Sequence, residues 1–286
     1  MNDQGGAETT TPYSTTQAQR LRELGADPDV CAARFVDVAA RDAAFRDTAE
    51  RLARTERLGL HELRTSSRQP RIIALEGAVS DTLRGLGFVR VVTPHLISRE
   101  ALAKMGIDHG HPLHDQVFWV EDGRCLRPML APGLYSLMRR LARVWTKPFG
   151  IFEIGTCFRR DTKGASHLNE FTMLNLVELG GRADTRRARL DDLANRVMHA
   201  AGIDTFELVG STSEVYGEMF DVEVNGMEVC SAALGPHALD GNWGIVDPWV
   251  GLGFGLERLL MARERYANIE RAGRSLSYID GARLNV

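Results

Sequence analysis

The segment at residues 170–179, EFTMLNLVEL, carries one amide among apolar side chains. Alternation along a strand places Phe171, Met173, Asn175 and Val177 on one face of it. An amide on such a face needs a hydrogen-bond partner, and a bound ligand is one candidate. Phe171 and Val177, taken singly, are better explained as ordinary core residues.

The preceding segment, IFEIGTCFR at residues 151–159, predicts a partner strand, and a polar loop at about residues 160–169 joins the two strands. The same alternation places Glu153, Cys157 and Arg159 on one face of this strand. An arginine, an amide and an aromatic ring would then share the floor of one sheet.

A second arginine stands in GLGFGLERLL at residues 251–260. Gly251, Gly253 and Gly255 alternate along a predicted strand, which lets a ligand lie flat against the backbone. Arg258 follows where a helix begins, and its guanidinium can donate two parallel hydrogen bonds to phosphate oxygens. The glycine pattern alone is weak and lacks the spacing of the dinucleotide and P-loop fingerprints. Followed at once by a hydrophobic residue, Glu and Arg, it is much more specific.

The elements that must position these residues predict an α+β fold, because helical patterns come first in the chain and a mostly antiparallel sheet with helical insertions follows. Ser14 or Thr15 can cap the first helix, and Gly25 can end it. Asn225-Gly226 between two apolar runs is a strong hairpin signal. We expect helices at residues 14–50, 72–86, 184–201 and from 256 onward, and further strands at residues 206–210, 220–224 and 227–234.

The composition excludes several classes of protein. Hydrophobic residues make up 44% and charged residues 26% of the chain, as in globular proteins, and no apolar run approaches the roughly 20 residues of a membrane-spanning helix. The net charge of −3 argues against a protein that only coats nucleic acid, so any such contact must be a local patch. Four scattered cysteines and an N-terminus without leader-like features predict reduced thiols, no structural zinc and a cytoplasmic location.

Three short motifs are more informative in their order than any one of them alone. They are Pro94 within GFVRVVTPHLIS, FRRD at residues 158–161, and GLGFGLER at residues 251–258. In this order they resemble motifs 1, 2 and 3 of the class II aminoacyl-tRNA synthetases. Motif 2 has Glu where this chain has Asp161, whose carboxylate is one methylene shorter, and this puts its contact with ATP in doubt.

Longer segments narrow the resemblance to one family. From about residue 15 onward the chain resembles the pyrrolysyl-tRNA synthetases, in the branch without a separate N-terminal tRNA-binding domain. The segments are RPMLAPGLYSLMRRL, FEIGTCFRRD, HLNEFTMLNLV, EVYGEMFDVEVNGMEVCSAALGPH and PWVGLGFGLERLL. The resemblance implies a class II synthetase catalytic fold with a mostly antiparallel sheet flanked by helices. It also implies ATP-dependent activation of pyrrolysine and its transfer to the 3′ end of a suppressor tRNA, tRNA(Pyl).

The resemblance further implies a domain plan. Residues 1–13 would be a disordered tail, residues 14–71 a helical segment that contacts tRNA, and residues 72–286 the catalytic domain. Motif 1 would form the interface of a homodimer. Two basic groups could follow tRNA phosphates, although solvated helix faces explain them equally well: Arg139, Arg140, Arg143 and Lys147 in one, and Arg182, Arg186, Arg187, Arg189 and Arg196 in the other.

By motif match, Arg159 and Arg258 would be the catalytic arginines, acting through positioning and charge neutralisation. Arg159 would contact the α-phosphate of ATP. Arg258 would hold the γ-phosphate and enclose adenine against Phe171. The backbone at His167 and Leu168 would read the adenine edge.

Glu228 and Ser231 match positions that carry Mg²⁺, and a carboxylate with a hydroxyl suits this cation. Strict alternation places residues 228 and 231 on opposite faces of a strand, so either a bulge lies between them or one acts from longer range. Without the resemblance, Glu228 is equally consistent with a surface charge on an edge strand.

The amino-acid pocket that the resemblance implies is deep and apolar. Asn175 would hydrogen-bond the amide carbonyl of pyrrolysine, and Tyr216 would reach its ring from a mobile loop. Such a pocket would tolerate bulky Nε-acyl lysine derivatives. Its residues would be Ala131, Leu134, Tyr135, Met138, Asn175, Val177, Tyr216, Ala233, Trp249 and Gly251. Helical spacing alone favours core packing for the first four.

Two other departures from the family pattern stand beside the site: Leu252 between two glycines, and Gly133 in place of a polar residue. Leu252 either points into the sheet or narrows the site.

Three other functions stay open. The first is activation of another amino acid, such as a phenylalanine-like or phosphoserine-like one, against which Asn175, Tyr216 and Trp249 argue. The second is a synthetase-like protein that binds tRNA or a protein without catalysis, and the presence of both arginines argues against it. The third is transfer of the adenylate to another acceptor, against which the basic groups argue only weakly.

Overall fold

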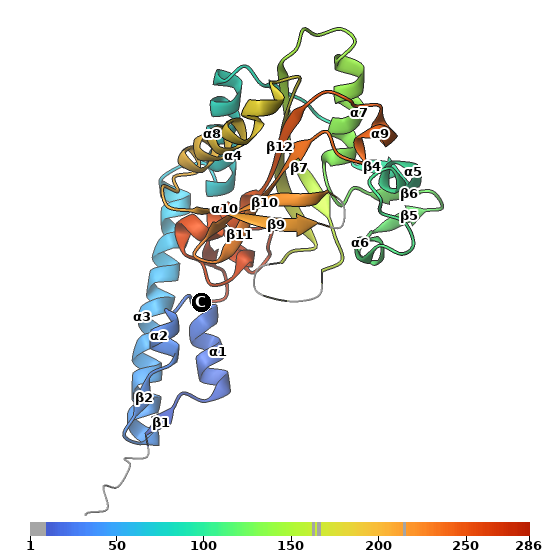
Figure 1. Cartoon of the computed structure of the whole chain (residues 1–286). Helices are drawn as coiled ribbons and strands as arrows, with labels where there is room; N and C mark the ends of the chain where they lie inside the picture. The colour runs from blue at the N-terminus through green and yellow to red at the C-terminus, as the bar shows by residue number, and fades with distance from the viewer. Residues whose placement is uncertain (1–9, 162–163, 165–166, 214–215) are drawn as a thin grey trace, which may run out of the picture. The chain divides into compact units, whose positions relative to one another are not determined.

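A seven-stranded sheet carries the functional elements (Figure 1). The computed structural model describes residues 10–286 except 162–163, 165–166 and 214–215. The strand order is β3-β7-β8-β12-β11-β10-β9, and β3 pairs in parallel with β7 whereas the other neighbours are antiparallel. The strands are β3 (Val89–Arg90), β7 (Phe149–Phe158), β8 (Glu170–Leu179), β9 (Glu207–Ser213), β10 (Gly217–Val224), β11 (Met227–Gly235) and β12 (Trp249–Gly255). The predicted α+β class is confirmed.

The two faces of this sheet have different coverings. On one face, α4 (Arg71–Gly85), α8 (Arg186–Ala200) and α10 (Leu256–Glu264) pack over a continuous apolar core. On the other face, α7 (Ala131–Leu141) and α9 (Asp240–Trp243) pack with a second apolar cluster. That cluster includes residues of a small sheet of β4 (Leu96–Ser98), β6 (Arg124–Leu126) and β5 (Trp119–Glu121). Short elements complete this part of the chain: α5 (Arg99–Ala103), α6 (Pro112–Asp115), η1 (Ala183–Thr185) and η2 (Ile269–Arg271).

Alternation along β12 separates glycines from core residues. Leu252 and Phe254 belong to the core beneath α4, α8 and α10, and Leu252 is only 2% exposed. The intervening glycines therefore face the opposite side. The sequence left two alternatives for Leu252, pointing into the sheet or narrowing the site, and its side chain points into the core.

The hairpin at Asn225-Gly226 forms as predicted. Asn225 has φ 51° and Gly226 has φ 75°, and the two residues join β10 to β11. Both positions need a left-handed backbone, which Asn and Gly adopt more readily than other residues.

No described helix combines the length and apolarity that a bilayer crossing demands.

The chain divides into two compact units, Gln69–Arg274 with the large sheet, and Met1–Arg68 with Ser275–Val286. The second unit contains α1 (Thr15–Glu23), α2 (Pro28–Cys31), α3 (Val38–Thr65) and the strand pairs β1 (Thr11–Pro12) with β2 (Arg34–Phe35) and β13 (Tyr278–Ile279) with β14 (Ala282–Arg283). The last twelve residues, which the sequence-based plan gave to the catalytic domain, thus belong with the N-terminal helices. The backbone N–H of Arg283 donates to Glu56 on α3 over 2.6 Å.

The expected disordered tail extends too far toward the first helix. Residues 1–9 of it lie outside the described residues. Thr11–Pro12 form β1, paired with β2, and the Tyr13 side chain is buried against Phe35. Ser14 caps α1 through a reciprocal capping box with Gln17, as the sequence predicts.

Candidate active site

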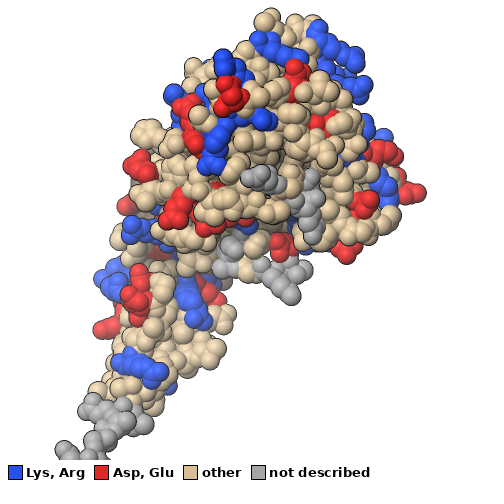
Figure 2. All heavy atoms as spheres, viewed as in Figure 1, with Lys and Arg blue, Asp and Glu red and all other residues tan. Residues whose placement is uncertain are grey.

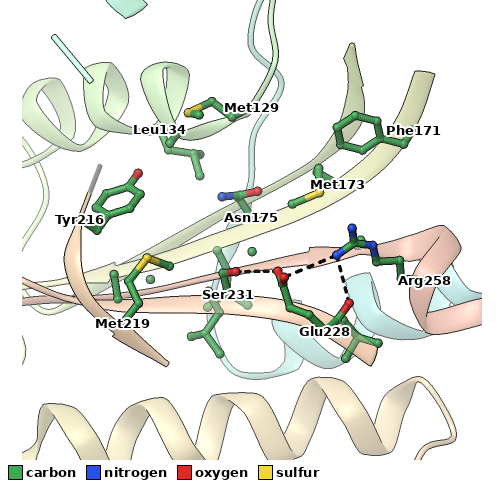
Figure 3. A pocket seen from close by; sticks show the side chains of 18 of the residues that line it. Met129, Leu134, Phe171, Met173, Asn175, Tyr216, Met219, Glu228, Ser231 and Arg258 are labelled. Atoms are coloured by element: carbon green, nitrogen blue, oxygen red, sulfur yellow. Dashed lines mark hydrogen bonds and ion pairs between the residues drawn. The ribbon is translucent and has the colours of Figure 1, made fainter. Parts of the chain in front are cut away.

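One cavity of about 260 Å³ lies on the glycine side of the sheet, between the strands and α7 (Figure 3). Every site residue predicted from the sequence lines it. The residues assigned to ATP or metal are Arg159, Asp161, His167, Leu168, Phe171, Glu228, Ser231 and Arg258. The residues assigned to the amino acid are Ala131, Leu134, Tyr135, Met138, Asn175, Val177, Tyr216, Ala233, Trp249 and Gly251. In Figure 3, Phe171 and Arg258 lie toward one end, Leu134 and Tyr216 toward the other, and Asn175 and Ser231 between them.

Arg159 leaves the end of β7 with its guanidinium facing the polar end of the cavity. Its Nε donates to the carbonyl oxygen of Pro128 over 2.8 Å, and its guanidinium carbon lies 5.4 Å from the centre of the Phe171 ring. Burial lowers the pKa of the Arg159 guanidinium, and the nearby positive charge of Arg258 lowers this pKa further. Two guanidinium groups that disfavour each other's charge form a site suited to an anion.

Arg258 stands in the first turn of α10 and is held by groups from two other segments. Its Nη1 donates to the carbonyl oxygen of Glu228 over 3.1 Å and lies 3.8 Å from Oε2 of the same residue. Its Nη2 lies 3.3 Å from Nε2 of His167, which in turn lies 3.6 Å from Oδ2 of Asp161. Because these side chains are partly exposed, a charged ligand can compete for the guanidinium.

A β-bulge places Glu228 and Ser231 on the same side of β11. Val222 pairs with Cys230, but the next residue of β10, Glu223, pairs with Glu228, so Val229 is the extra residue. The Ser231 hydroxyl then donates to Oε1 of Glu228 over 2.8 Å. Of the two alternatives that the sequence left open, a bulge or action from longer range, the strand takes the bulge.

The donor set at this end fits a cation held mainly by phosphates. Within the described part of the chain, no group of three or more His, Cys, Asp or Glu side chains could hold a metal by itself. One carboxylate with one hydroxyl matches the sparse protein ligation that Mg²⁺ accepts when phosphates supply the other oxygens.

The other end of the cavity is apolar and buried. Leu134, Tyr135 and Met138 of α7 belong to the second apolar cluster and also line the cavity, so they are core residues that face an open space. Sequence reasoning missed three flexible side chains that line this cavity: Met129, Met173 and Met219. Alternation on β8 could have assigned Met173, since it shares a face with Asn175.

Asn175 supplies a polar atom in the middle of the cavity. Its Oδ1 is buried and has no hydrogen-bond partner among the described residues. A Cβ at Gly253, its neighbour on β12, would lie 3.2 Å from Nδ2, so the glycine leaves room for the amide. A buried amide with an unsatisfied oxygen, facing a cavity, is where a polar group of a ligand is expected.

A buried ion pair that sequence reasoning missed supports both ends. Arg127 and Glu153 are 2% and 1% exposed, and Nη1 of Arg127 lies 2.7 Å from Oε1 of Glu153. The Arg127 guanidinium also donates to the carbonyl oxygens of Thr93 and Thr156, which ties three chain segments together. The carbonyl oxygen that orients Arg159 belongs to the next residue, Pro128, and α7 begins three residues later.

Gly133 is explained by this cluster. A Cβ at Gly133 would lie 2.5 Å from Oγ1 of Thr93, whose hydroxyl donates to Glu153 over 2.7 Å. With Thr93 in this place, α7 can approach closely only with glycine at position 133.

A second missed carboxylate, Glu257, anchors α10 to the sheet. It accepts hydrogen bonds from the backbone N–H of Thr172 on β8 at 2.9 Å, and burial raises the pKa of its carboxyl group. This anchor fixes the start of the helix that carries Arg258.

Comparisons with known proteins relate the whole chain to one family. Residues 60–232 match the family described as "Phenylalanyl tRNA synthetase beta chain CLM domain". The crystal structure of pyrrolysyl-tRNA synthetase from Desulfitobacterium hafniense is 51% identical with a TM-score of 0.92, covering 96% of this chain and 99% of that one. A structure of Desulfitobacterium hafniense PylSc, a pyrrolysyl tRNA synthetase, is 50% identical with a TM-score of 0.91, covering 98% and 100%. The chain therefore belongs to the pyrrolysyl-tRNA synthetases, a family of aminoacyl-tRNA ligases, within the wider synthetase domain family that its residues 60–232 match.

Proposed function

We propose that this protein activates pyrrolysine with ATP and transfers it to the 3′ end of tRNA(Pyl). One observation carries the proposal: a single cavity joins the two arginines at its polar end to an apolar end, with the buried oxygen of Asn175 between them. The two Desulfitobacterium hafniense structures, described as pyrrolysyl-tRNA synthetases, support the choice of substrate.

In the first step the carboxylate of pyrrolysine attacks the α-phosphorus of ATP, the new oxygen–phosphorus bond forms, and pyrophosphate leaves. Arg159 neutralises the charge that builds on the α-phosphate, and Arg258 gives up Glu228 and His167 to hold the γ-phosphate. Adenine lies between Arg258 and Phe171, with its edge against the backbone at His167 and Leu168. Asp161, which reaches His167, completes this end.

Mg²⁺, when bound, supplies positive charge to the phosphates, with Glu228 and Ser231 as its protein ligands. Their shared face on β11 and their short mutual hydrogen bond support this assignment.

At the apolar end, the Nδ2 of Asn175 donates to the amide carbonyl oxygen of pyrrolysine, and its Oδ1 is left to accept from an N–H group of the substrate. Tyr216 covers the ring. The walls are Ala131, Leu134, Tyr135, Met138, Val177, Ala233, Trp249 and Gly251. Apolar walls and flexible methionines distinguish similar groups weakly, so bulky Nε-acyl lysine derivatives should also be accepted.

We propose that tRNA(Pyl) contacts basic side chains on both units. Arg139, Arg140 and Arg143 are exposed, and Figure 2 shows Lys and Arg gathered over α7 and the segment after it. On the other unit, α3 exposes further arginines within the helical segment 14–71. Phosphate contacts of this kind weaken as salt rises.

We further propose a homodimer formed through motif 1, acting in the cytoplasm. Around Pro94 the apolar side chains of Val89, Val92 and Leu96 are exposed, and a partner chain would cover them. The four free cysteines fit a reducing compartment.

Amino-acid-dependent exchange between ATP and pyrophosphate tests the proposal without tRNA. The panel is pyrrolysine, an Nε-carbamate of lysine, lysine, phenylalanine and phosphoserine. Exchange with the first two and not with lysine is expected. Exchange only with phenylalanine or phosphoserine would replace the substrate, and no exchange with any of them would contradict the activity.

A further inference from the structure

A buried carboxylate that sequence reasoning passed over lies behind the apolar end of the cavity. Asp240, the first residue of α9, is 1% exposed. Its Oδ1 accepts a hydrogen bond from the hydroxyl of Tyr135 over 2.8 Å. Its Oδ2 accepts from the indole N–H of Trp249 over 2.7 Å and from the backbone N–H of His237 over 2.8 Å. One carboxylate therefore accepts hydrogen bonds from two aromatic side chains that line the cavity, Tyr135 and Trp249.

His237 fixes the direction of the Tyr135 hydroxyl. Its Nδ1 accepts from the backbone N–H of Leu239 over 3.3 Å, so in the neutral ring the proton is on Nε2. That nitrogen lies 3.3 Å from the Tyr135 oxygen. Tyr135 accepts from His237 and donates to Asp240, which leaves its hydroxyl one orientation.

Two glycines shape the space for the Trp249 ring. A Cβ at Gly235 would overlap the indole nitrogen, and a Cβ at Gly251 would lie 2.9 Å from the far edge of the ring. Packing between these backbones sets the plane of the indole. The hydrogen bond to Asp240 then fixes which edge of the ring faces the cavity.

The Asp240 carboxylate does more than hydrogen-bond the backbone of its own loop. Burying a carboxylate costs several kcal/mol unless hydrogen bonds replace its water, and an apolar cluster of the same shape is often as stable. Of the three hydrogen bonds that the Asp240 carboxylate accepts from described residues, one comes from the His237 N–H in the loop after β11, and two come from rings that line the cavity. The carboxylate is therefore placed to orient the walls.

We propose that Asp240 is a positioning residue that fixes Tyr135 and Trp249 and thereby sets which side-chain terminus the amino-acid cavity selects. This inference rests on the proposed function, in which that cavity binds the side chain of the activated amino acid. Asp240 does not line the cavity and touches no substrate, so it acts through the two rings.

The test is the exchange of ATP with pyrophosphate by the full chain carrying Asp240→Asn. The amide keeps the shape of the carboxylate but turns one acceptor into a donor. A hydrogen bond to a charged group contributes about 1.5–3 kcal/mol, so the KM for pyrrolysine should rise at least about tenfold. The KM for ATP should stay within about twofold. The ratio of kcat/KM for pyrrolysine to kcat/KM for a linear Nε-carbamate of lysine should fall several-fold.

Asp247→Asn is the matched control. It removes a carboxylate from the same chain segment, paired there with Lys147 near the surface, and should leave both KM values and the ratio unchanged. A rise of both KM values together in Asp240→Asn, or an unchanged substrate ratio, would show a merely structural role and overturn the inference.

Tyr135→Phe keeps the test decisive if Asp240→Asn does not fold. It removes only the hydroxyl that donates to Asp240. The ratio of kcat/KM for pyrrolysine to kcat/KM for the carbamate should therefore fall, as in Asp240→Asn, and an unchanged ratio would overturn the inference. Where both variants fold, the variant that carries Asp240→Asn and Tyr135→Phe together should have the substrate ratio of the more affected single variant. Strict additivity of the two changes would argue against coupling between Asp240 and Tyr135. If the unaltered protein activates a different amino acid, the proposed function fails. The same KM comparison with that amino acid then tests Asp240.

Discussion

The two ends of the cavity are built on opposite principles. At the polar end, Arg258 is held by partly exposed groups of Glu228 and His167, which a ligand can displace. At the apolar end, Tyr135 and Trp249 are held by a fully buried carboxylate that no ligand replaces. Under the proposed function, the exchangeable ion pairs bind ATP, which all synthetases share, and the pre-formed contacts bind the amino acid, which differs between them.

Arg127→Met removes the support that both ends share, and should have the largest effect. It leaves the carboxylate of Glu153 buried without its ion partner, which costs about 3–5 kcal/mol of unfolding free energy. Urea unfolding measures this loss. Arg124→Met, which breaks an exposed ion pair with Glu121, should change stability by less than about 1 kcal/mol. Equal losses in the two variants would contradict the role of the buried pair.

Arg258→Ala breaks only the polar end. Loss of a group that stabilises developing charge typically lowers kcat about 10²–10³-fold, and the melting temperature should hardly change because the side chain is partly exposed. Pyrophosphate exchange and thermal melting measure the two effects. Arg263→Ala, on the same helix, serves as the control for loss of an arginine. Near-normal exchange in Arg258→Ala would remove it from the phosphate site.

Gly133→Ala tests the fit between α7 and the shared support. The added Cβ would press on Thr93, and overpacking of this kind costs about 1–3 kcal/mol. Gly77→Ala is the comparison, because α4 has open space at that position and should gain up to about 1 kcal/mol. Opposite signs of the two changes in unfolding free energy are expected, and the same sign would refute the close approach at Gly133.

Asn175→Ala acts on the apolar end alone. One hydrogen bond to the substrate is lost, so the KM for pyrrolysine should rise about tenfold while the KM for ATP stays constant. The variant should admit other bulky amino acids more readily. Asn195→Ala, at an exposed position of α8, controls for loss of an amide. Unchanged pyrrolysine kinetics would remove Asn175 from the pocket.

Substitution of His237 should have the smallest effect on stability, and this effect depends on pH. Burial lowers the pKa of its imidazole below the ordinary 6.5, against an opposing influence of Asp240. Below pH 6.5 the unfolded chain therefore binds this proton more readily than the folded chain does, and stability falls until the pH passes the folded pKa. Unfolding at pH 7.5 and pH 5.5 should show a smaller acid loss for His237→Gln than for the unaltered protein. Identical losses would mean that this ring does not titrate as described.

The sequence predicts best what is local or repeated within a family. The strand at 170–179, the turn at Asn225-Gly226 and the conflict in alternation between Glu228 and Ser231 all follow from neighbouring residues. Every residue that the resemblance assigned to a ligand lines the cavity.

What escaped prediction depends on partners far apart in the chain. Asp240 meets Tyr135 across 105 positions, and Arg283 meets Glu56 across 227. Neither spacing nor composition distinguishes such a carboxylate from a surface charge, because its burial is decided only when the tertiary structure forms.

The bulge at Val229 makes the proposed metal site on β11 depend on the number of residues in the strand as well as on their identity. One extra position shifts the phase of the strand, so that two oxygen donors three residues apart face the same way. Deletion of Val229 would restore regular pairing and leave the two donors two residues apart, still on one face. Insertion of one residue beside the bulge would instead put them out of phase and turn one donor toward the helix-covered core. In this stretch a single-codon insertion would therefore be more damaging than a single-codon deletion.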